Sequence, residues 1–594
     1  MASLTESLPD TALTRLFEQK IRSGEAVWFS VPGGNPLFLA GEPADQLYLL
    51  RTGRLGAIRR EEGHEPQFLG VIRPGEPAGE MALIAGAAHS ASVMALRDSE
   101  ILGLPREVFF QAAESDPEVM TQLARLMILR ARQTARKASI GEPSVFGFVA
   151  ASGAANARDL AEQVAVAIGR LDYSVTVVGG EAQHAPTEWF SNVEHAHDFV
   201  LYAAEADETG WKTLVGRQVD RLFRVGRGDL APPENPDVRA AEPLQKQGLI
   251  DLILVQPADA AAPSGSAAWV DTYQPARFFQ MRRDRAADIA RIARVITGQS
   301  VGLVLSGGGA RAYAHVGAIE ALHQRGVPVD FVCGVSMGAI VGAGLAMGWD
   351  DDELDMRIRK AFVDTSPLDD IAFPLIAMTH GLKVRDRLTE HFGDRQIEDL
   401  WLPFFCLSSN LTTGAYQMHK RGPVADALRA SIALPGILPP SLFNKDVLVD
   451  GAVMKNFPAD VMRMTQLGPI VGVDVTQGRS ITADDVARPA SVLRWILSGQ
   501  WKKGPPIVSL LMRTATVSTS RDLTAARDAT DVLVMPDVSK VEIRDFDAYE
   551  PAVSAGYRAT IAALDKLTLP VQSLRRRRSL DELAVASGRA PIAR

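Results

Sequence analysis

The 594-residue chain lacks the features that define several protein classes. Its two cysteines, Cys333 and Cys406, both lie in apolar runs, which argues against a disulfide framework or a zinc cluster and favours a reducing compartment. Its formal net charge is -8, so it has no overall basic character with which to bind nucleic acid. These absences indicate a reduced globular protein that has no nucleic-acid partner.

Segments that target or anchor proteins are also scarce. The first twenty residues lack the basic start and apolar core of a secretory signal. Residues 331–349 contain no charged side chain, but they include five glycines and read as a buried strand, turn and helix rather than a membrane span. We therefore expect a cytoplasmic protein whose membrane contact is peripheral, at the inner membrane.

What the chain does have is a glycine-rich block beginning at Val301. An apolar strand and a helix are followed by a second apolar run that ends in Gly334-Val335-Ser336-Met337-Gly338. A serine between two glycines, where a strand turns sharply into a helix, is typical of a nucleophile elbow, because larger neighbours would block the turn. Ser336 is the predicted nucleophile, and Gly334 and Gly338 are the predicted elbow glycines.

A second glycine cluster, Gly307-Gly308-Gly309, precedes Arg311 and follows the first strand. Consecutive glycines let backbone N–H groups converge on one point, which suits an oxyanion hole. A phosphate-binding loop would require a Gly-Lys-Ser/Thr sequence, which is missing here. The pattern favours acyl transfer, with these glycines and Arg311 around the oxyanion.

The nucleophile needs a base, and the last histidine of the chain is His419. An acid between Ser336 and His380, His391 or His419 would give the order of an α/β-hydrolase, and this alternative stays open. The simpler hypothesis uses Asp450, which ends the apolar strand DVLVD and precedes Gly451. Asp450 would then take the proton from Ser336 directly.

Four motifs in this block, SGGGARA, GVSMG, ALRASIALPGILPP and LVDGAVMKNFP, resemble those of patatin-like phospholipases. The resemblance implies a three-layer α/β/α catalytic domain over residues 298–570, and a Ser336/Asp450 dyad that needs no metal or cofactor. It implies hydrolysis of acyl esters in phospholipids or lysophospholipids. Ala312 and Ala452 stand where the family commonly has glycine, which we expect to alter local packing more than chemistry.

Residues 1–140 predict a β-roll of short strands, including 47–50, 55–58, 90–96 and 100–104, and helices that include one over 106–137. The segment 73–96 resembles the phosphate-binding cassette of cyclic nucleotide-binding domains, with Gly79 and Glu80 at the ribose position. The family's phosphate-binding arginine is replaced by His89, which is mostly neutral at cytosolic pH. We expect weak or lost binding of cyclic AMP and cyclic GMP.

Residues 141–297 alternate helices with apolar strands expected at 145–150, 172–180, 197–204 and 249–256, which predicts a Rossmann-like α/β domain whose loop AASGAANARD is a degenerate phosphate loop. A basic helix is expected over 278–298; its solvated face would carry Arg282, Arg283, Arg285, Arg291 and Arg294.

Trp495 and Trp501 suit a membrane interface, and residues 571–594 predict a basic, disordered tail.

This multidomain order resembles bacterial relatives of neuropathy target esterase, which implies a lysophospholipase or phospholipase B activity. The alternative is a regulatory or scaffolding protein with a catalytically weak patatin-like block and a ligand-sensing N-terminal domain. Intact Ser336, Asp450 and the triple glycine favour the enzyme.

Overall fold

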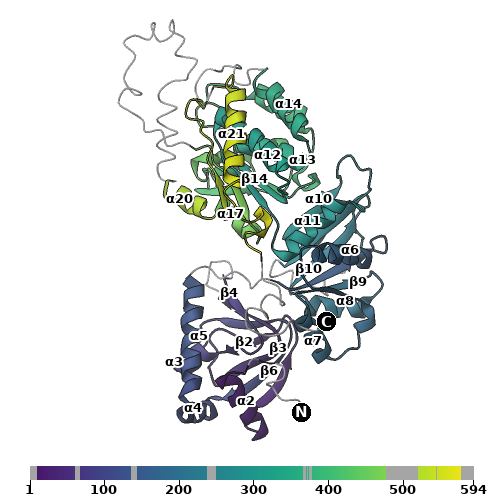
Figure 1. Cartoon of the computed structure of the whole chain (residues 1–594), viewed down its shortest axis with the longest axis vertical. Coiled ribbons are helices and arrows are strands. Elements are labelled where there is room, and N and C mark those ends of the chain that lie inside the picture. The colour runs from purple at the N-terminus through teal and green to yellow at the C-terminus, as the bar shows by residue number, and fades with distance from the viewer. Residues whose placement is uncertain are drawn as a thin grey trace.

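Three sheets organise the computed structural model, with the β-roll at one end of the molecule and the third sheet at the other (Figure 1). It describes residues 8, 10–59, 67–135, 143–236, 249–364, 370, 372, 377–476, 520–543 and 545–576. Trp495 and Trp501 lie outside the described residues. Within the described part of the chain, no helix combines the length and the apolar character needed to cross a bilayer.

The first sheet is an antiparallel β-roll in the order β1-β6-β3-β4, with β2 on β6 and β5 on β3. Where the sequence predicted pairs of short strands, β3 and β6 each run on for 14 residues. Their pairing shifts register between Leu50 and Leu55, so polar residues interrupt the apolar pattern without ending the strand. The strands are β1 Val27–Val31, β2 Pro36–Phe38, β3 Gln46–Arg59, β4 Gln67–Ile72, β5 Pro77–Ala78 and β6 Ser92–Pro105.

Helices cover one side of the roll (Figure 1): α2 Ala12–Arg22, α3 Glu80–Ala85, α4 Arg106–Ser115 and α5 Pro117–Ala135. The single helix expected over 106–137 is therefore two. Asp116 has an extended backbone, and Pro117 is the first residue of α5. Proline is tolerated there because the first N–H groups of a helix have no intrahelical acceptor. The break is a proline effect that helical periodicity alone does not reveal.

The second sheet is wholly parallel, in the order β12-β11-β10-β7-β9-β8. Sequence analysis identified β7 Val145–Ala150, β8 Val175–Val178, β9 Phe199–Ala204 and β11 Ile250–Gln256, but missed β10 Arg221–Arg227 and β12 Arg277–Arg282. Arginine occurs at both ends and in the middle of β10, and at both ends of β12. Arg221 and Arg277 each pair with the buried carboxylate of Asp251 at the sheet, so charges occur where continuous apolar residues were expected.

The basic helix predicted over 278–298 is corrected to strand β12 followed by α11 Ala286–Thr297. Arg283 and Arg285 are exposed as expected, but Arg291 and Arg294 do not belong to a solvated face. Arg291 is buried and donates to the carbonyls of Trp401 and Gln280, and Arg294 donates two hydrogen bonds to Asp330. Arg291 and Arg294 thus link the second sheet to the segments that precede β15 and β14 of the third sheet.

The third sheet carries the catalytic block, in the order β17-β18-β15-β14-β13-β19-β20, with β16 on the edge of β15. Its strands are β13 Gly302–Leu305, β14 Phe331–Val335, β15 Phe404–Asn410, β16 Ala415–His419, β17 Ser441–Phe443, β18 Asp446–Asp450, β19 Ile470–Val473 and β20 Val532–Val534. The principal helices against it are α12 Ala314–Gln324, α13 Met337–Met347, α14 Asp351–Phe362, α15 Leu382–Phe392, α16 Val424–Ser431, α17 Ala459–Thr465, α20 Ser520–Asp528 and α21 Tyr549–Leu564.

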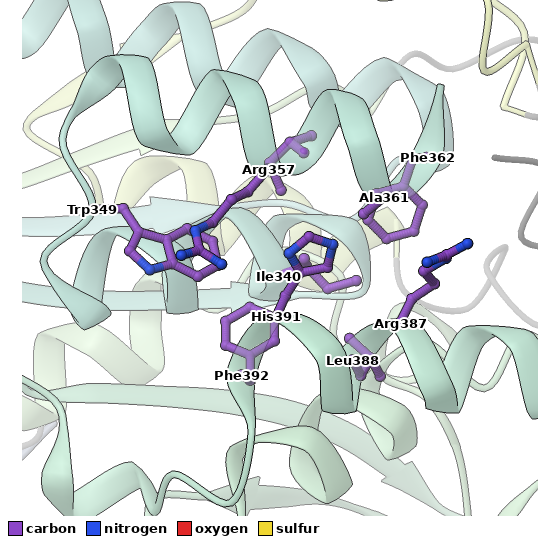
Figure 2. A pocket seen from close by; sticks show the side chains of 10 residues that line it. Ile340, Trp349, Arg357, Ala361, Phe362, Arg387, Leu388, His391 and Phe392 are labelled. Carbon is purple, nitrogen blue, oxygen red and sulfur yellow. The ribbon is translucent and has the colours of Figure 1, made fainter. Parts of the chain in front are cut away.

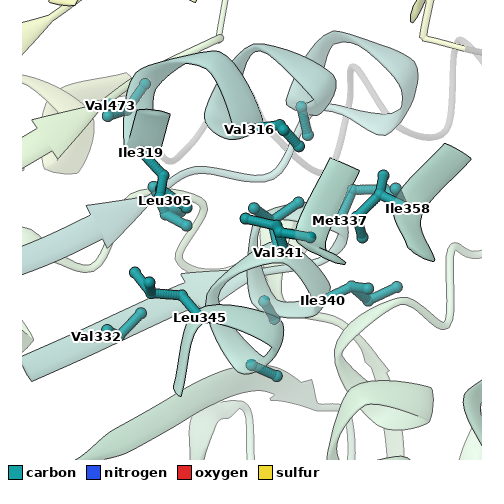
Figure 3. Close-up of a cluster of buried hydrophobic side chains, with 14 of the residues drawn as sticks. Leu305, Val316, Ile319, Val332, Met337, Ile340, Val341, Leu345, Ile358 and Val473 are labelled. Carbon is teal, nitrogen blue, oxygen red and sulfur yellow. The ribbon is translucent and has the colours of Figure 1, made fainter. Parts of the chain in front are cut away.

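A buried apolar cluster packs α12, α13 and α14 onto one face of this sheet (Figure 3). Leu305, Val332 and Val473 come from three neighbouring strands, and Ile340 and Val341 from α13. A second cluster contacts the opposite face and is shared with the middle sheet, where the rings of Phe279 and Phe331 meet edge to face at 5.9 Å. The catalytic sheet is thus covered on both faces, as α/β layers require.

Buried ion pairs also join the middle domain to the β-roll. Arg54 and Arg97 of the roll form ion pairs of 2.5 Å and 2.6 Å with Asp220 and Glu194, and all four side chains are largely buried. The predicted disordered tail is corrected at its start, because Val571 is buried and Arg575 pairs with Asp531. Residues 577–594 lie outside the described residues.

Candidate active site

Ser336 stands at the turn between β14 and α13, with φ 54° and ψ -130°. A non-glycine residue rarely adopts this strained conformation, and here it is held by close packing of the two elbow glycines. A Cβ on Gly334 would lie 2.5 Å from the backbone of Gly338, and a Cβ on Gly338 would lie 2.5 Å from the carbonyl oxygen of Ser306. The glycine requirement of the predicted elbow is therefore a steric one.

Strand pairing brings Asp450 to this turn. The first half of β15 pairs with β14, but β15 continues beyond the end of β14, and β18 returns antiparallel along that free edge. Ser408 pairs with Asp450 in this register, so β18 ends beside the elbow. The Ser336 hydroxyl donates a 2.7 Å hydrogen bond to Oδ2 of Asp450, although the residues are 114 positions apart.

The Asp450 carboxylate is buried, with 1% of its surface exposed. Burial raises its pKa to about 6, and the hydrogen bonds from Ser336 and from the Ala452 amide oppose that rise. The amide of Ala452 donates to Oδ1 at 2.9 Å, which leaves Oδ2 facing the serine. A carboxylate with a raised pKa and a fixed orientation is suited to accept a proton near neutral pH.

Ser431 on α16 supports the elbow and was missed in the sequence analysis. Its Oγ accepts a 2.9 Å hydrogen bond from the backbone N–H of Ser336 and donates at 2.7 Å to the carbonyl of Leu407. The hydroxyl thereby ties the strained turn to β15. Ser431 lies in the motif ALRASIALPGILPP, but nothing in the sequence distinguishes it from the other residues of that motif.

The glycine loop after β13 lies beside Ser336, since a Cβ on Gly307 would come within 3.1 Å of the serine Cβ. The amide of Gly307 donates to the carbonyl of Asn456 at 3.4 Å, and that of Ala310 donates to the carbonyl of Ile543 at 2.8 Å. Within the described residues, the amides of Gly308 and Gly309 have no such acceptor. Of the three predicted glycines, these two have N–H groups available for an oxyanion.

Arg311 follows the loop in the short helical turn Gly309–Tyr313. Its Nε donates at 2.7 Å to the carbonyl of Val541, in the segment that also receives the Ala310 amide. Arg311 therefore fastens the loop to the C-terminal part of the domain. This contact gives it a supporting position beside the predicted oxyanion site.

Asn456 is a further residue that sequence analysis did not single out. Its Nδ2 donates to the Gly307 carbonyl at 3.2 Å and to Thr476 Oγ1 at 2.8 Å. The same residue thus holds the glycine loop through both its backbone and its side chain. It lies in the quoted motif LVDGAVMKNFP, and only the fold reveals that this motif reaches the loop.

Among the contacts of the described residues, none of the three histidines of the alternative mechanism is hydrogen-bonded to Ser336. His419 is buried, shares a 2.8 Å hydrogen bond with Ser408 Oγ, and has a pKa lowered by burial to about 4. His391 lines a cavity of about 10 Å³ between α13, α14 and α15 (Figure 2), space for roughly one water molecule. The backbone N–H of His380 donates to the carbonyl of Asp370. The hydrogen-bond acceptor of Ser336 is Asp450.

In the β-roll, Glu80 and His89 of the predicted nucleotide cassette are engaged by other residues of the roll. Glu80 is buried and accepts a 2.6 Å hydrogen bond from Arg130 of α5. His89 is buried and stacks on Phe38, with ring centroids 3.7 Å apart, and burial lowers its pKa. A Cβ on Gly79 would lie 3.2 Å from the His89 ring. The histidine therefore packs as a neutral aromatic group where the family has a cation.

The loop after β7 in the middle domain does not offer a phosphate site either. It leads into α6 Ala157–Gly169, where the amide of Arg158 donates to the carboxylate of Glu205 at 2.9 Å, and Asn156 caps the amide of Asp159. A protein carboxylate thus takes the position at the helix N-terminus that an anion would use. Across the described residues, no cluster of three or more His, Cys, Asp or Glu side chains is arranged to hold a metal ion.

Known proteins match both ends of this architecture. Residues 303–463 match the family described as patatin-like phospholipase, and residues 28–116 match the cyclic nucleotide-binding domain. The chain is 32% identical over 553 residues to an NTE family protein of Mycobacterium tuberculosis, across 90% of this chain and 91% of that protein.

More distant similarities concern parts of other proteins. The chain is 27% identical over 606 residues to patatin-like phospholipase domain-containing protein 6 of Homo sapiens, across 89% of this chain and 44% of that protein. A solved catabolite activator protein of Thermus thermophilus matches at 24% identity with a TM-score of 0.20, across 29% of this chain and 70% of that chain. Taken with the near full-length match, the two family matches show that the chain belongs to the NTE family and carries an N-terminal cyclic nucleotide-binding domain and a C-terminal patatin domain.

Proposed function

We propose that the chain is a serine esterase that hydrolyses acyl ester bonds of phospholipids or lysophospholipids through a Ser336/Asp450 dyad. The class of lipid ester hydrolase follows from the family. The observation that carries the dyad is the 2.7 Å hydrogen bond from the strained Ser336 hydroxyl to a buried carboxylate whose pKa is raised to about 6. The proposed units are residues 1–140, 141–297 and 298–570.

In the proposed reaction, Ser336 Oγ attacks the ester carbonyl carbon while Asp450 accepts the hydroxyl proton. The negative charge that develops on the carbonyl oxygen is stabilised by the N–H groups of Gly308 and Gly309. The positive N-terminal end of α12, the helix that follows the glycine loop, adds to this stabilisation. Collapse of the intermediate expels the alcohol, which takes the proton from Asp450. Asp450 then accepts a proton from water as the water oxygen attacks the acyl carbonyl carbon. The bond to Ser336 Oγ breaks, Oγ takes the proton from Asp450, and the fatty acid leaves.

Two variants test this reaction on the purified chain. Ser336→Ala removes the nucleophile, and Asp450→Asn removes the base while preserving shape, so each should reduce release of fatty acid from lysophosphatidylcholine by at least a thousandfold. Replacement of His380, His391 or His419 by glutamine is the control, with hydrolysis within about threefold of wild type expected. Substantial turnover by Asp450→Asn, or its loss in a histidine variant, would contradict the dyad.

We further propose that the β-roll acts without binding cyclic nucleotide, and that any influence on the catalytic domain passes through the middle domain. The Glu80–Arg130 pair and the stacked His89 support the first part. The buried Arg54–Asp220 and Arg97–Glu194 pairs, together with the apolar cluster shared by the second and third sheets, support the second. The protein would act at the membrane surface as a peripheral, cytoplasmic enzyme.

A further inference from the structure

The antiparallel extension of the catalytic sheet presents an apolar face to solvent. Directly paired residues of neighbouring strands share a face, as do residues two positions apart. Leu442 pairs with Val447, the Leu411 amide donates to the Val447 carbonyl, and Tyr416 pairs with Ser409, two positions before Leu411. Leu411, Tyr416 and Leu442 therefore lie on one face of β15–β18, which we name the extension face.

These side chains are exposed to an unusual degree for their size. Leu442 is 79% exposed, Leu411 53% and Tyr416 39%. Phe443, also exposed, lies on the other face of the same hairpin, where its ring meets that of His419 at 6.1 Å. A group of large apolar side chains left in water marks a surface that is covered by a partner during function.

The extension face lies at the same end of the catalytic sheet as the proposed dyad, although Asp450, three positions after Val447 on β18, lies on the opposite face. The strand that carries Val447 opposite Leu442 ends three residues later at Asp450, roughly 10 Å along the strand. Asp450 is bonded to Ser336, so the face and the dyad lie at the same end of the catalytic sheet. A lipid that leaves its layer at this end of the sheet would pass the end of β18 to reach the nucleophile on the other face.

The two described turns that border the face contain no acidic residue. Thr412 and Thr413 form the turn between β15 and β16, and Asn444 and Lys445 form the tight turn between β17 and β18. The acid of this hairpin, Asp446, is partly buried and accepts a hydrogen bond from Asn410. These turns therefore contribute one positive charge, that of Lys445, in a chain whose net charge is -8, and this charge is complementary to anionic headgroups.

We propose that the extension face, formed by Leu411, Tyr416 and Leu442 with Lys445 at its rim, docks the enzyme on an anionic phospholipid surface. This inference rests on the proposed function, because the reason for placing a lipid layer here is the nearby dyad. The apolar side chains enter the acyl boundary, and Lys445 pairs with the headgroups. Docking then holds the dyad next to ester bonds of the layer.

Binding is measured in the Ser336→Ala background, so that it does not depend on catalysis. Vesicles of phosphatidylcholine with phosphatidylglycerol are sedimented with the full chain, and Leu411→Ser/Leu442→Ser is compared with Met464→Ser, a control residue that is 69% exposed on α17. The double variant should lose at least tenfold in apparent vesicle affinity, and Lys445→Glu should lose several-fold on anionic vesicles only. Met464→Ser should bind as the parent does.

Unchanged vesicle binding by the double variant would overturn the proposal. β17 is also an edge strand that a second copy could cover, so the oligomeric state is measured by light scattering. A shift to a smaller species without loss of vesicle binding would assign the face to a chain–chain contact and overturn lipid docking. With Ser336 restored, the ratio of vesicle to soluble-ester hydrolysis should fall at least tenfold. Absence of all hydrolysis in the wild type would instead overturn the proposed function.

Discussion

Arg97 of the β-roll and Glu194 of the middle domain form an ion pair of 2.6 Å in which both side chains are largely buried. Removing one member of a buried pair leaves the other uncompensated, which typically costs about 3–5 kcal/mol. Arg97→Ala should therefore lower the thermal unfolding midpoint and speed proteolytic release of the β-roll.

The controls separate burial from simple loss of charge. Arg158→Ala breaks only exposed pairs with Glu162 and Glu181, and should change the midpoint little. The double variant Arg97→Met/Glu194→Leu removes both charges and should recover part of the loss. An Arg97→Ala protein as stable as wild type would show that the interface does not depend on this pair.

Asp450→Asn should stabilise the protein at alkaline pH while abolishing activity. The folded pKa of Asp450 is raised to about 6 from 3.8, so its favourable contribution is complete below the unfolded pKa and is lost as pH rises through 6. Above that pH the buried charge destabilises the wild type by about 2–3 kcal/mol. The unfolding midpoint of Asp450→Asn should exceed that of wild type at pH 8 and approach it at pH 4.5.

Ser336→Ala is the matched control for this measurement, because it keeps the buried carboxylate and should show no comparable gain at pH 8. A midpoint for Asp450→Asn equal to or below that of wild type at pH 8 would contradict the assigned environment of the carboxylate.

Asn456→Ala should lower kcat more than it raises KM. The carboxamide holds the carbonyl of Gly307 and Thr476 Oγ1, so its loss loosens the loop that carries Gly308 and Gly309. Loss of about 1.4–2.7 kcal/mol of transition-state stabilisation corresponds to roughly a tenfold to hundredfold fall in kcat. Asn156→Ala, which removes a helix cap in the middle domain, is the control and should leave kcat unaltered.

An increase in KM with unaltered kcat for Asn456→Ala would assign the residue to substrate binding instead of to the oxyanion loop. Steady-state kinetics on lysophosphatidylcholine distinguish the two outcomes.

Titration of the full chain with cyclic AMP and cyclic GMP should give no binding in the submicromolar range. Phosphate would meet the neutral His89 ring on Phe38, and the ribose would compete with Arg130 for Glu80. His89→Arg alone should not restore tight binding, because the Glu80–Arg130 pair persists. A submicromolar affinity of the wild type for either nucleotide would contradict the proposal that the β-roll acts without binding cyclic nucleotide.

The parts predicted from sequence are those in which local pattern and chemistry coincide. Ser336 and its glycines form one contiguous motif, and Asp450 ends a recognisable apolar strand, so the two members of the proposed dyad could be named before the fold was known. Ser431 and Asn456 escaped because their roles depend on contacts with residues 95 and 149 positions away. Strands β10 and β12 escaped because buried ion pairs with Asp251 place arginine inside a parallel sheet.

The dyad is tested most directly by the pH dependence of Ser336 labelling with a fluorophosphonate, since this reaction needs the nucleophile and its base but no lipid surface. The labelling rate of wild type should rise with a midpoint near pH 6, where Asp450 ionises, and then level off. In Asp450→Asn the rate should be at least a hundredfold lower and lack this transition. Equal labelling of Asp450→Asn and wild type, with the same pH profile, would contradict the account.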